Sequence, residues 1–143
     1  MTFLRQKSTH TASEAKDEIQ GLLRQIVIER DGGCVLRHYR EAGACGGYTK
    51  AGDLILQFDH LNSRVHSSSF GDERLGVCVC KRHHIFWKKQ YPAKYEELVR
   101  RHIGKARCDL LDLVLEDNHK PYKADWKLVK LGLERTLKNL KKI

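Results

Sequence analysis

The sequence predicts a mainly helical α+β domain built around a small core that metal-binding side chains hold together. Two stretches carry apolar residues at helical spacing, one near each end of the chain, over residues 19–27 and 126–140. Between them, two short apolar runs end in groups of side chains that can bind metal ions. These groups are Asp59-His60 and the run from Cys80 to His84.

Length and patterning fit one domain. A chain of 143 residues is long enough for a modest core, and no internal repeat divides it. Residues 1–12 are basic and polar without a period, so we expect a flexible N-terminal arm there. A single domain should follow over residues 13–143. Within it we expect the core at about residues 30–90 and a helical extension over residues 91–143.

The chain is basic and contains an odd number of cysteines. Its 27 Lys and Arg residues outnumber its 18 Asp and Glu residues, which gives a net charge of +9 and a pI near 9.4. Such a charge is expected of a protein that binds phosphate backbones, although basic surfaces also serve solubility. Five cysteines without an apolar leader favour metal ligands in a reducing compartment over a secreted disulfide scaffold. No apolar run is long enough to cross a bilayer, so we expect no membrane association.

The first helix is predicted over the stretch that ends near Arg30. Thr11 and Glu14 have the spacing of a capping box, and the apolar residues that follow recur at i, i+3, i+4, i+7 and i+8. Residues 31–33, Asp-Gly-Gly, end the pattern. A helix with one apolar stripe needs a partner, which the C-terminal helices can supply. The stripe consists of Ile19, Leu22, Leu23, Ile26 and Val27.

Residues 34–52 form a long Gly-rich stretch without a helical or strand period. A connection of this length is unusual unless something holds it in place. Tetrahedral zinc would do so, with Cys34 and Cys45 as ligands from this stretch and Cys80 and His83 from the later group. Zinc would then join distant parts of the chain.

Alternatives to this ligand set stay open. The two cysteines of the stretch are also consistent with small buried apolar side chains. His38 is the second choice for the second ligand. Cys78, which we place on the same strand face as Cys80, is a further replacement. Cys108 lies in a helical stretch and is most simply a core residue.

Two short strands and a helix are predicted in the middle of the chain. The largely apolar run 54–58 is typical of a strand, and it delivers Asp59 and His60 to an exposed polar loop. A second strand is expected around residues 77–79. From Cys80 to Lys89 the spacing becomes helical, so the chain should turn there into a helix.

Three further helical stretches are predicted toward the C-terminus. The first begins at Pro92 and ends at Gly104, and the second spans Cys108–Leu115. The last runs from Ala124 to Lys142, with one apolar stripe and a Lys-rich face. That basic face is either solvated or laid along DNA. It consists of Lys127, Lys130, Lys138, Lys141 and Lys142.

The pair Asp59-His60, followed about a strand and a turn later by Cys-x-x-His-His, resembles the ββα-metal core of the HNH endonucleases. The resemblance implies that Asp59 and His84 hold one catalytic divalent cation, Mg²⁺ or Mn²⁺, and that His60 is the general base. It also implies that Cys80 and His83 belong to a separate structural zinc site. The fold class that follows is a zinc-stapled ββα-metal core flanked by N- and C-terminal helices.

Beyond the core, residues 24–143 resemble the phage NinG/Rap recombination endonucleases. The similar parts are Ile-Glu-Arg-Asp at residues 28–31, the segment 101–104 and the basic last helix. This resemblance implies branched recombination intermediates as substrates. The sequence departs from the pattern at two points. The middle Asn of the family falls on Leu75, and NinG proteins space their Asp and His differently. Asn62 is a local candidate to brace the loop in place of that Asn.

We therefore expect a metal-dependent DNA endonuclease that hydrolyses phosphodiester bonds. The alternative is a non-catalytic zinc-containing module that binds DNA, and a third reading is an interaction protein whose terminal helices form a homodimer. The resemblance implies a cytoplasmic protein of a bacterial or phage-infected cell. Basic residues near the core are candidate contacts with DNA phosphates, although a charged surface alone would explain them. They are Arg64, Arg74, Arg82, Lys88 and Lys89.

Overall fold

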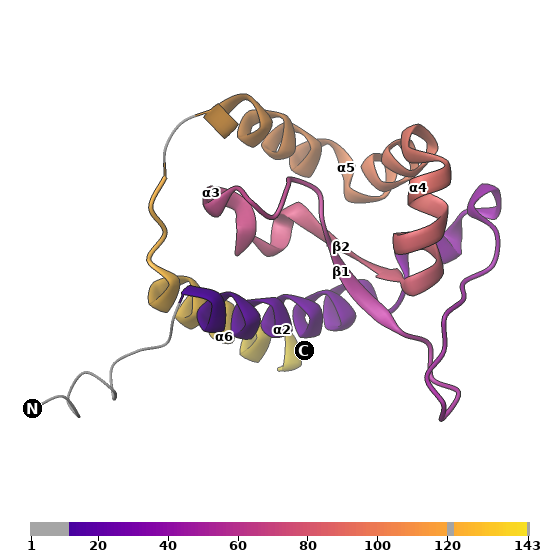
Figure 1. The fold of residues 1–143 in the computed structure, drawn as a ribbon, viewed down its shortest axis with the longest axis horizontal. Coiled ribbons are helices and arrows are strands. Elements are labelled where there is room, and N and C mark those ends of the chain that lie inside the picture. Colours follow the sequence, from indigo (N-terminus) through magenta and orange to yellow (C-terminus); the bar gives the residue numbers. More distant parts are fainter. Residues whose placement is uncertain (1–11, 120–121, 143) are drawn as a thin grey trace, which may run out of the picture.

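The computed structural model describes residues 12–119 and 122–142. Over these residues the chain is mainly helical and contains a two-stranded antiparallel sheet (Figure 1). The arm expected at residues 1–12 lies outside the described residues except for Ala12, where the first described helix begins. The helices are α2 (Ala12–Asp31), α3 (Ser67–Phe70), α4 (Lys88–Gln90), α5 (Pro92–Glu116) and α6 (Trp126–Lys141), and the strands are β1 (Leu56–His60) and β2 (Gly76–Cys80).

Helices α2 and α6 pack side by side and cover one face of the sheet (Figure 1). The stripe predicted on α2 is the reason, since Ile19, Leu23 and Ile26 are completely buried there. From α6, Leu133 and Leu137 enter the same core. Burial of two facing apolar stripes supplies most of the stabilisation that such helices need. The predicted partnership between the first and last helices is confirmed.

The last helix begins later than expected because of its cap. Asp125 has an extended backbone, and its side chain accepts a hydrogen bond from the Leu128 N–H at 3.2 Å. This is the geometry of an N-cap residue, so the first helical residue is Trp126.

The strands pair in antiparallel register and both faces of β2 are buried. Phe58 faces Cys78 across the sheet, and both belong to the core shared with α2 and α6. The opposite face packs on α5, where Val77 and Val79 meet Tyr95 and other buried residues. The strand, loop, strand and helix order predicted for the middle of the chain is present.

One detail of β2 differs from the sequence prediction. Cys78 packs with α2 and α6, whereas Cys80 packs in the other core, so the two side chains do not share a face. The cause is the end of the strand: Lys81 already has helical backbone angles of φ −57° and ψ −41°. The chain turns at Cys80, and strict alternation fails for the last residue.

The helix after β2 contains a π-helical segment. Residues Arg82–Trp87 form the π-helix, and α4 follows it directly. A π-helix has a wider turn than an α-helix and is frequently found at functional sites. The sequence predicted a helix here but not its type.

Helix α5 contains the break that the sequence predicted. Gly104 has a φ of +84°, a left-handed conformation that only glycine adopts readily, and it separates two helical halves. An ion pair of 2.9 Å between Arg100 and Asp112 joins the halves. In the described part of the chain, no helix combines the length and the apolar character required to cross a bilayer.

Gly76 allows close contact within the sheet, and its replacement tests that packing. A Cβ at this position would overlap the aromatic ring of Phe58. We expect Gly76→Ala to lower the free energy of unfolding by roughly 1–3 kcal/mol, as overpacking of a core does. Gly132→Ala is the matched control, because a Cβ there meets nothing within 4 Å. Urea denaturation measures both, and equal stabilities for the two variants would contradict the packing described.

Candidate functional site

Four side chains that the sequence nominated as zinc ligands lie together. Their ligand atoms, from Cys34, Cys45, Cys80 and His83, are all within 4.8 Å of one another. Cys34 follows the end of α2, Cys45 lies in the long loop, and the other two flank the turn from β2 into the π-helix. The structure therefore confirms that these residues lie close enough to bind a metal ion.

Hydrogen bonds bring the separate segments to this point. The carboxylate of Asp31, at the end of α2, accepts from the Cys78 N–H at 2.9 Å, which places Cys34 beside β2. The long loop is tied to the turn by the Arg82 N–H, which donates to the Gly46 carbonyl at 3.1 Å. Gly46 follows Cys45 directly, so this hydrogen bond positions the Cys45 thiol in the cluster.

The distances in the cluster fit tetrahedral coordination. His83 Nδ1 lies 3.5 Å from the sulfur of Cys34, 3.9 Å from that of Cys45 and 3.1 Å from that of Cys80. Zinc bonds of about 2.3 Å to sulfur and 2.0 Å to nitrogen, at tetrahedral angles, separate S and N by about 3.5 Å. A zinc ion therefore fits between these atoms without a large movement.

The His83 ring is oriented for metal binding. Its Nε2–H donates to the Ala42 carbonyl at 2.9 Å, so Nδ1 carries the lone pair and faces the three sulfurs. Metal-bound histidines usually donate their second ring N–H to such an acceptor. Burial lowers the pKa of His83 below its ordinary value, which favours the neutral ring that a metal requires.

Two thiols of the cluster have raised pKa values. Burial raises the pKa of Cys34, and burial together with the charges of Cys34 and Cys80 raises the pKa of Cys45 to about 12. A divalent cation reverses this balance, because it stabilises thiolates directly. The cluster thus consists of three sulfurs and one imidazole nitrogen, which are ligands that a soft cation would bind.

The alternative ligands do not join the cluster. His38 is exposed and stacks on His102 with ring centroids 6.3 Å apart. Cys78 lies in the core on the other side of the sheet. Cys108 is half-buried, and its Sγ–H donates to the Arg100 carbonyl at 3.4 Å.

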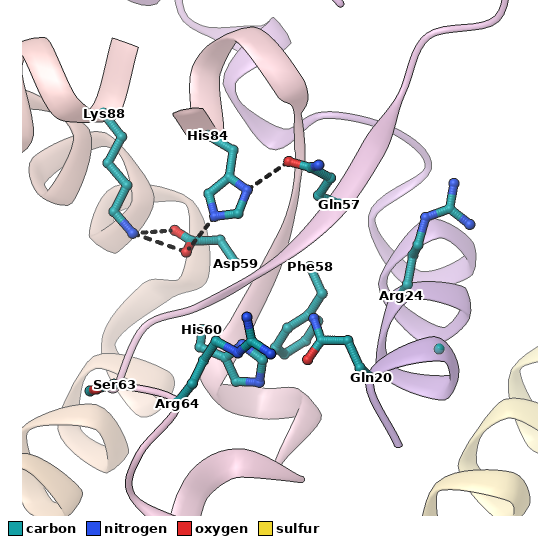
Figure 2. A pocket seen from close by; sticks show the side chains of 11 residues that line it. Gln20, Arg24, Gln57, Phe58, Asp59, His60, Ser63, Arg64, His84 and Lys88 are labelled. Carbon is teal, nitrogen blue, oxygen red and sulfur yellow. Dashed lines mark hydrogen bonds and ion pairs between the residues drawn. The ribbon is translucent and has the colours of Figure 1, made fainter. Parts of the chain in front are cut away.

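The second group is centred on Asp59, which is 4% exposed. His84 Nε2 lies 3.2 Å from Asp59 Oδ1, and the Lys88 ammonium lies 2.9 Å from both carboxylate oxygens (Figure 2). The Tyr95 hydroxyl donates to Asp59 Oδ2 at 2.6 Å. Burial alone would raise the pKa of Asp59, but the His84 hydrogen bond and the Lys88 charge hold it below its ordinary value.

His84 presents Nε2 to Asp59 because Gln57 binds the other ring nitrogen. The distance from His84 Nδ1 to Gln57 Oε1 is 2.7 Å, so Nδ1 carries the proton that is donated to this amide oxygen. The second nitrogen, Nε2, lies 3.2 Å from Asp59 Oδ1, where a protonated ring donates to the carboxylate and a neutral ring presents a lone pair beside it. Neighbouring ligands of a six-coordinate cation, with bonds of about 2.1 Å, lie about 3.0 Å apart, so Mg²⁺ or Mn²⁺ fits the pair.

His60 is a neutral imidazole held in one orientation. Its Nε2–H donates to the Phe70 carbonyl at 3.2 Å, which leaves Nδ1 as the acceptor. The ring stacks on Phe70, with centroids 4.9 Å apart, and meets the Phe58 ring edge-on. Burial, together with the nearby Arg64 charge, lowers the pKa of His60 to about 4.

Asp59, His60 and His84 line one hollow of about 570 Å³ between α2, β1 and the π-helix (Figure 2). Arg24 and Gln20 of α2 form its far wall, where Arg24 Nε donates to the Leu56 carbonyl at 2.7 Å. Sequence reasoning missed these two residues. They lie on the polar side of α2, and no local signal shows which element that side faces.

The basic residues nominated as DNA contacts divide into two sets. Arg64 and Lys88 line the hollow, and Lys89 is exposed on α4. Arg74 is paired with Asp72 at 2.8 Å and does not line this hollow.

Arg82, which was also nominated as a DNA contact, does not line the hollow. Its guanidinium donates to the carbonyls of Ala42 and Ala44 and lies 3.2 Å from His83 Nε2. Leu75, which stands where the family pattern has Asn, is a buried core residue that is 2% exposed. Leu75 therefore offers no amide side chain at the position of the family's Asn.

Comparisons with family models, curated proteins and solved structures found no match to this chain. The interpretation of the site therefore depends on its own geometry. That geometry consists of a Cys₃His cluster and, beside it, a carboxylate with two imidazoles in a basic hollow.

Replacement of one thiol tests the metal cluster. Cys80→Ser removes one of three sulfurs, 3.1 Å from His83 Nδ1, so the thiolate-to-cobalt absorption that we expect for the wild type with Co²⁺ should become weaker. Cys108→Ser is the matched control, since a hydroxyl keeps the hydrogen bond to the Arg100 carbonyl. Absorption titration with Co²⁺ measures both variants, and an unchanged spectrum for Cys80→Ser would rule this cluster out as the binding site.

Proposed function

We propose that this protein is a metal-dependent DNA endonuclease of the HNH type. The observation that carries the proposal is the position of Asp59, His60 and His84, which line one basic hollow with the Asp59 and His84 ligand atoms 3.2 Å apart. Phosphodiester hydrolysis needs an activated water, a cation at the leaving oxygen and groups that tolerate added negative charge. The hollow contains side chains suited to each requirement.

The structural part of the proposal assigns zinc to Cys34, Cys45, Cys80 and His83. The fit of their distances to tetrahedral bonds supports this ion over Mg²⁺, since thiolates and imidazole are ligands that zinc prefers. Its role would be to hold the long loop and the end of α2 against the turn that begins the π-helix.

Asp59 and His84 would hold the catalytic cation, Mg²⁺ or Mn²⁺. When bound there, the cation would supply charge stabilisation at the leaving oxygen. His84 is kept in the required tautomer by Gln57. Asp59 is ionised near neutral pH, because its pKa lies below the ordinary value.

His60 would act as the general base through Nδ1. A neutral imidazole accepts a proton from water as the water oxygen forms its bond to phosphorus. The bond from phosphorus to the 3′ oxygen breaks, which leaves 5′-phosphate and 3′-hydroxyl ends. His60 is neutral over the whole physiological range, since its pKa is lowered to about 4.

The walls of the hollow support a nucleic-acid substrate. Arg24 and Arg64 both line it, and Gln20 and Gln57 add amide groups that can bind phosphate oxygens (Figure 2). A strand that follows these walls would bring its backbone past Asp59 and His60. Branched recombination intermediates remain the substrate class that the family resemblance implies.

A second candidate function is a zinc-containing module that binds DNA without cleaving it. One observation favours it: the Asp59 carboxylate already receives Lys88 on both oxygens and the Tyr95 hydroxyl on one. An ammonium in this position neutralises the charge that a metal would otherwise neutralise. Supercoiled plasmid separates the two functions, because only the nuclease nicks it in Mg²⁺ or Mn²⁺ and stops when a chelator is added.

Removal of the base tests the mechanism. We expect His60→Ala to reduce the rate of plasmid nicking by roughly 10²–10⁴-fold, the usual contribution of a general base. DNA affinity should stay near that of the wild type, because the basic walls remain. His38→Ala is the control, since this exposed histidine lies outside the hollow. Nicking at the wild-type rate by His60→Ala would overturn the assignment.

The wall formed by α2 gives a second, independent prediction. If Arg24 contacts a phosphate, Arg24→Gln should weaken DNA binding and reduce the slope of log affinity against log salt by about 1. Arg101→Gln is the matched control, because Arg101 lies on α5 and pairs with Glu41 and Glu97. Fluorescence anisotropy over a series of salt concentrations measures both slopes. Equal slopes for the two variants would remove α2 from the interface.

A further inference from the structure

Two asparagines from distant parts of the chain form a reciprocal pair beside the hollow. Asn62 Nδ2 donates to Asn118 Oδ1, and Asn118 Nδ2 donates to Asn62 Oδ1, each at 2.9 Å. Asn62 follows β1 by two residues, whereas Asn118 lies in the 3₁₀ turn Asp117–His119 at the end of α5. The pair therefore ties the loop after β1 to the C-terminal helical extension.

The remaining polar capacity of Asn62 is also used. Its Nδ2 donates to Ser69 Oγ at 2.6 Å, and its Oδ1 accepts from the Ser63 N–H at 3.1 Å. Asn62 and Ser69 are each 3% exposed. A buried and fully bonded amide of this kind fixes the groups around it, because leaving any one of them unpaired is costly.

The network ends next to His60. Ser69 is followed directly by Phe70, whose carbonyl accepts the His60 Nε2–H at 3.2 Å and whose ring stacks on the imidazole. Asn118, Asn62, Ser69 and Phe70 thus form a continuous path to His60. No residue in this path other than His60 lines the hollow of about 570 Å³.

We propose that Asn62 and Asn118 are positioning residues that keep His60 in the Nε2–H tautomer, with Nδ1 turned toward the hollow. The tautomer of a histidine is set by the partner of its other nitrogen, and here that partner is a carbonyl whose place the asparagine pair fixes. Helix α5 would thereby contribute to the site without touching substrate. The structural half of this inference stands alone, and its catalytic half rests on the proposed function.

The tautomer is measured directly by NMR. In protein labelled with ¹⁵N histidine, the His60 signals are identified by their loss in His60→Gln. We expect the wild type to show one protonated and one unprotonated nitrogen, with the proton on Nε2. In Asn118→Ala the two ¹⁵N shifts should move toward each other, because the ring exchanges between tautomers. Wild-type shifts in Asn118→Ala and in Asn62→Ala would overturn the proposal.

Cleavage kinetics provide the second readout. Single-turnover nicking should fall by roughly tenfold or more in Asn118→Ala, since small displacements of a reacting group cost up to about 10²-fold, while the DNA dissociation constant stays within about twofold. The double variant Asn62→Ala/Asn118→Ala should be no slower than the slower single variant, because both act through one path. Additive losses in rate would overturn the shared path.

Two controls separate a positioning role from a general loss of stability. Asn139→Ala changes an exposed asparagine on α6 and should leave both the ¹⁵N shifts and the rate unchanged. Asn118→Asp keeps an acceptor for Asn62 Nδ2 and should keep most of the wild-type tautomer. A lower melting temperature without a change in the His60 shifts would overturn the proposal. If the wild type does not nick DNA, the proposed function fails, while the NMR result still decides the structural inference.

Discussion

The arrangement of the site depends on one point, at which Cys34, Cys45, Cys80 and His83 meet within 4.8 Å. Three segments reach this point from α2, the long loop and β2. The turn after Cys80 begins the π-helix, and this helix directs His83 to the sulfurs while its neighbour His84 faces Asp59. Anything that loosens the cluster therefore also displaces a side chain of the adjoining hollow. Structure and proposed chemistry are connected through a single turn.

Asp59 is the second constraint, because two sets of groups compete for its carboxylate. Lys88 and Tyr95 satisfy both oxygens, yet Oδ1 also lies 3.2 Å from the His84 nitrogen. The Lys88 side chain is 38% exposed, so it has room to leave the carboxylate and reach a phosphate in the hollow. Binding of a cation and release of Lys88 would then be coupled. In this view the lysine neutralises Asp59 in the free protein and neutralises substrate in the complex.

Sequence patterns were sufficient for the features that depend on local spacing. The apolar stripe of α2 and the break at Gly104 follow from periodicity and from glycine. The four clustered ligands come from distant segments, and they followed from the chemistry of Cys and His together with the family resemblance. Other features depend on packing between distant elements, and no local pattern contains them. Arg24 enters the hollow only because α2 lies along β1, and Tyr95 reaches Asp59 only because α5 covers the opposite side. The prediction that Cys78 and Cys80 share one strand face was wrong for a local reason, because the chain turns at the end of β2.

Anomalous diffraction from crystals grown with Zn²⁺ and soaked in Mn²⁺ tests the central claim, which is that neighbouring histidines serve two separate metal sites. Data at the zinc edge should show one peak enclosed by His83 Nδ1 and the sulfurs of Cys34, Cys45 and Cys80. Data at the manganese edge should show a different peak bound by Asp59 and His84 Nε2, with Lys88 moved off the carboxylate. A zinc peak at Asp59 and His84, or Lys88 still bound to Asp59 with no manganese there, would contradict the account.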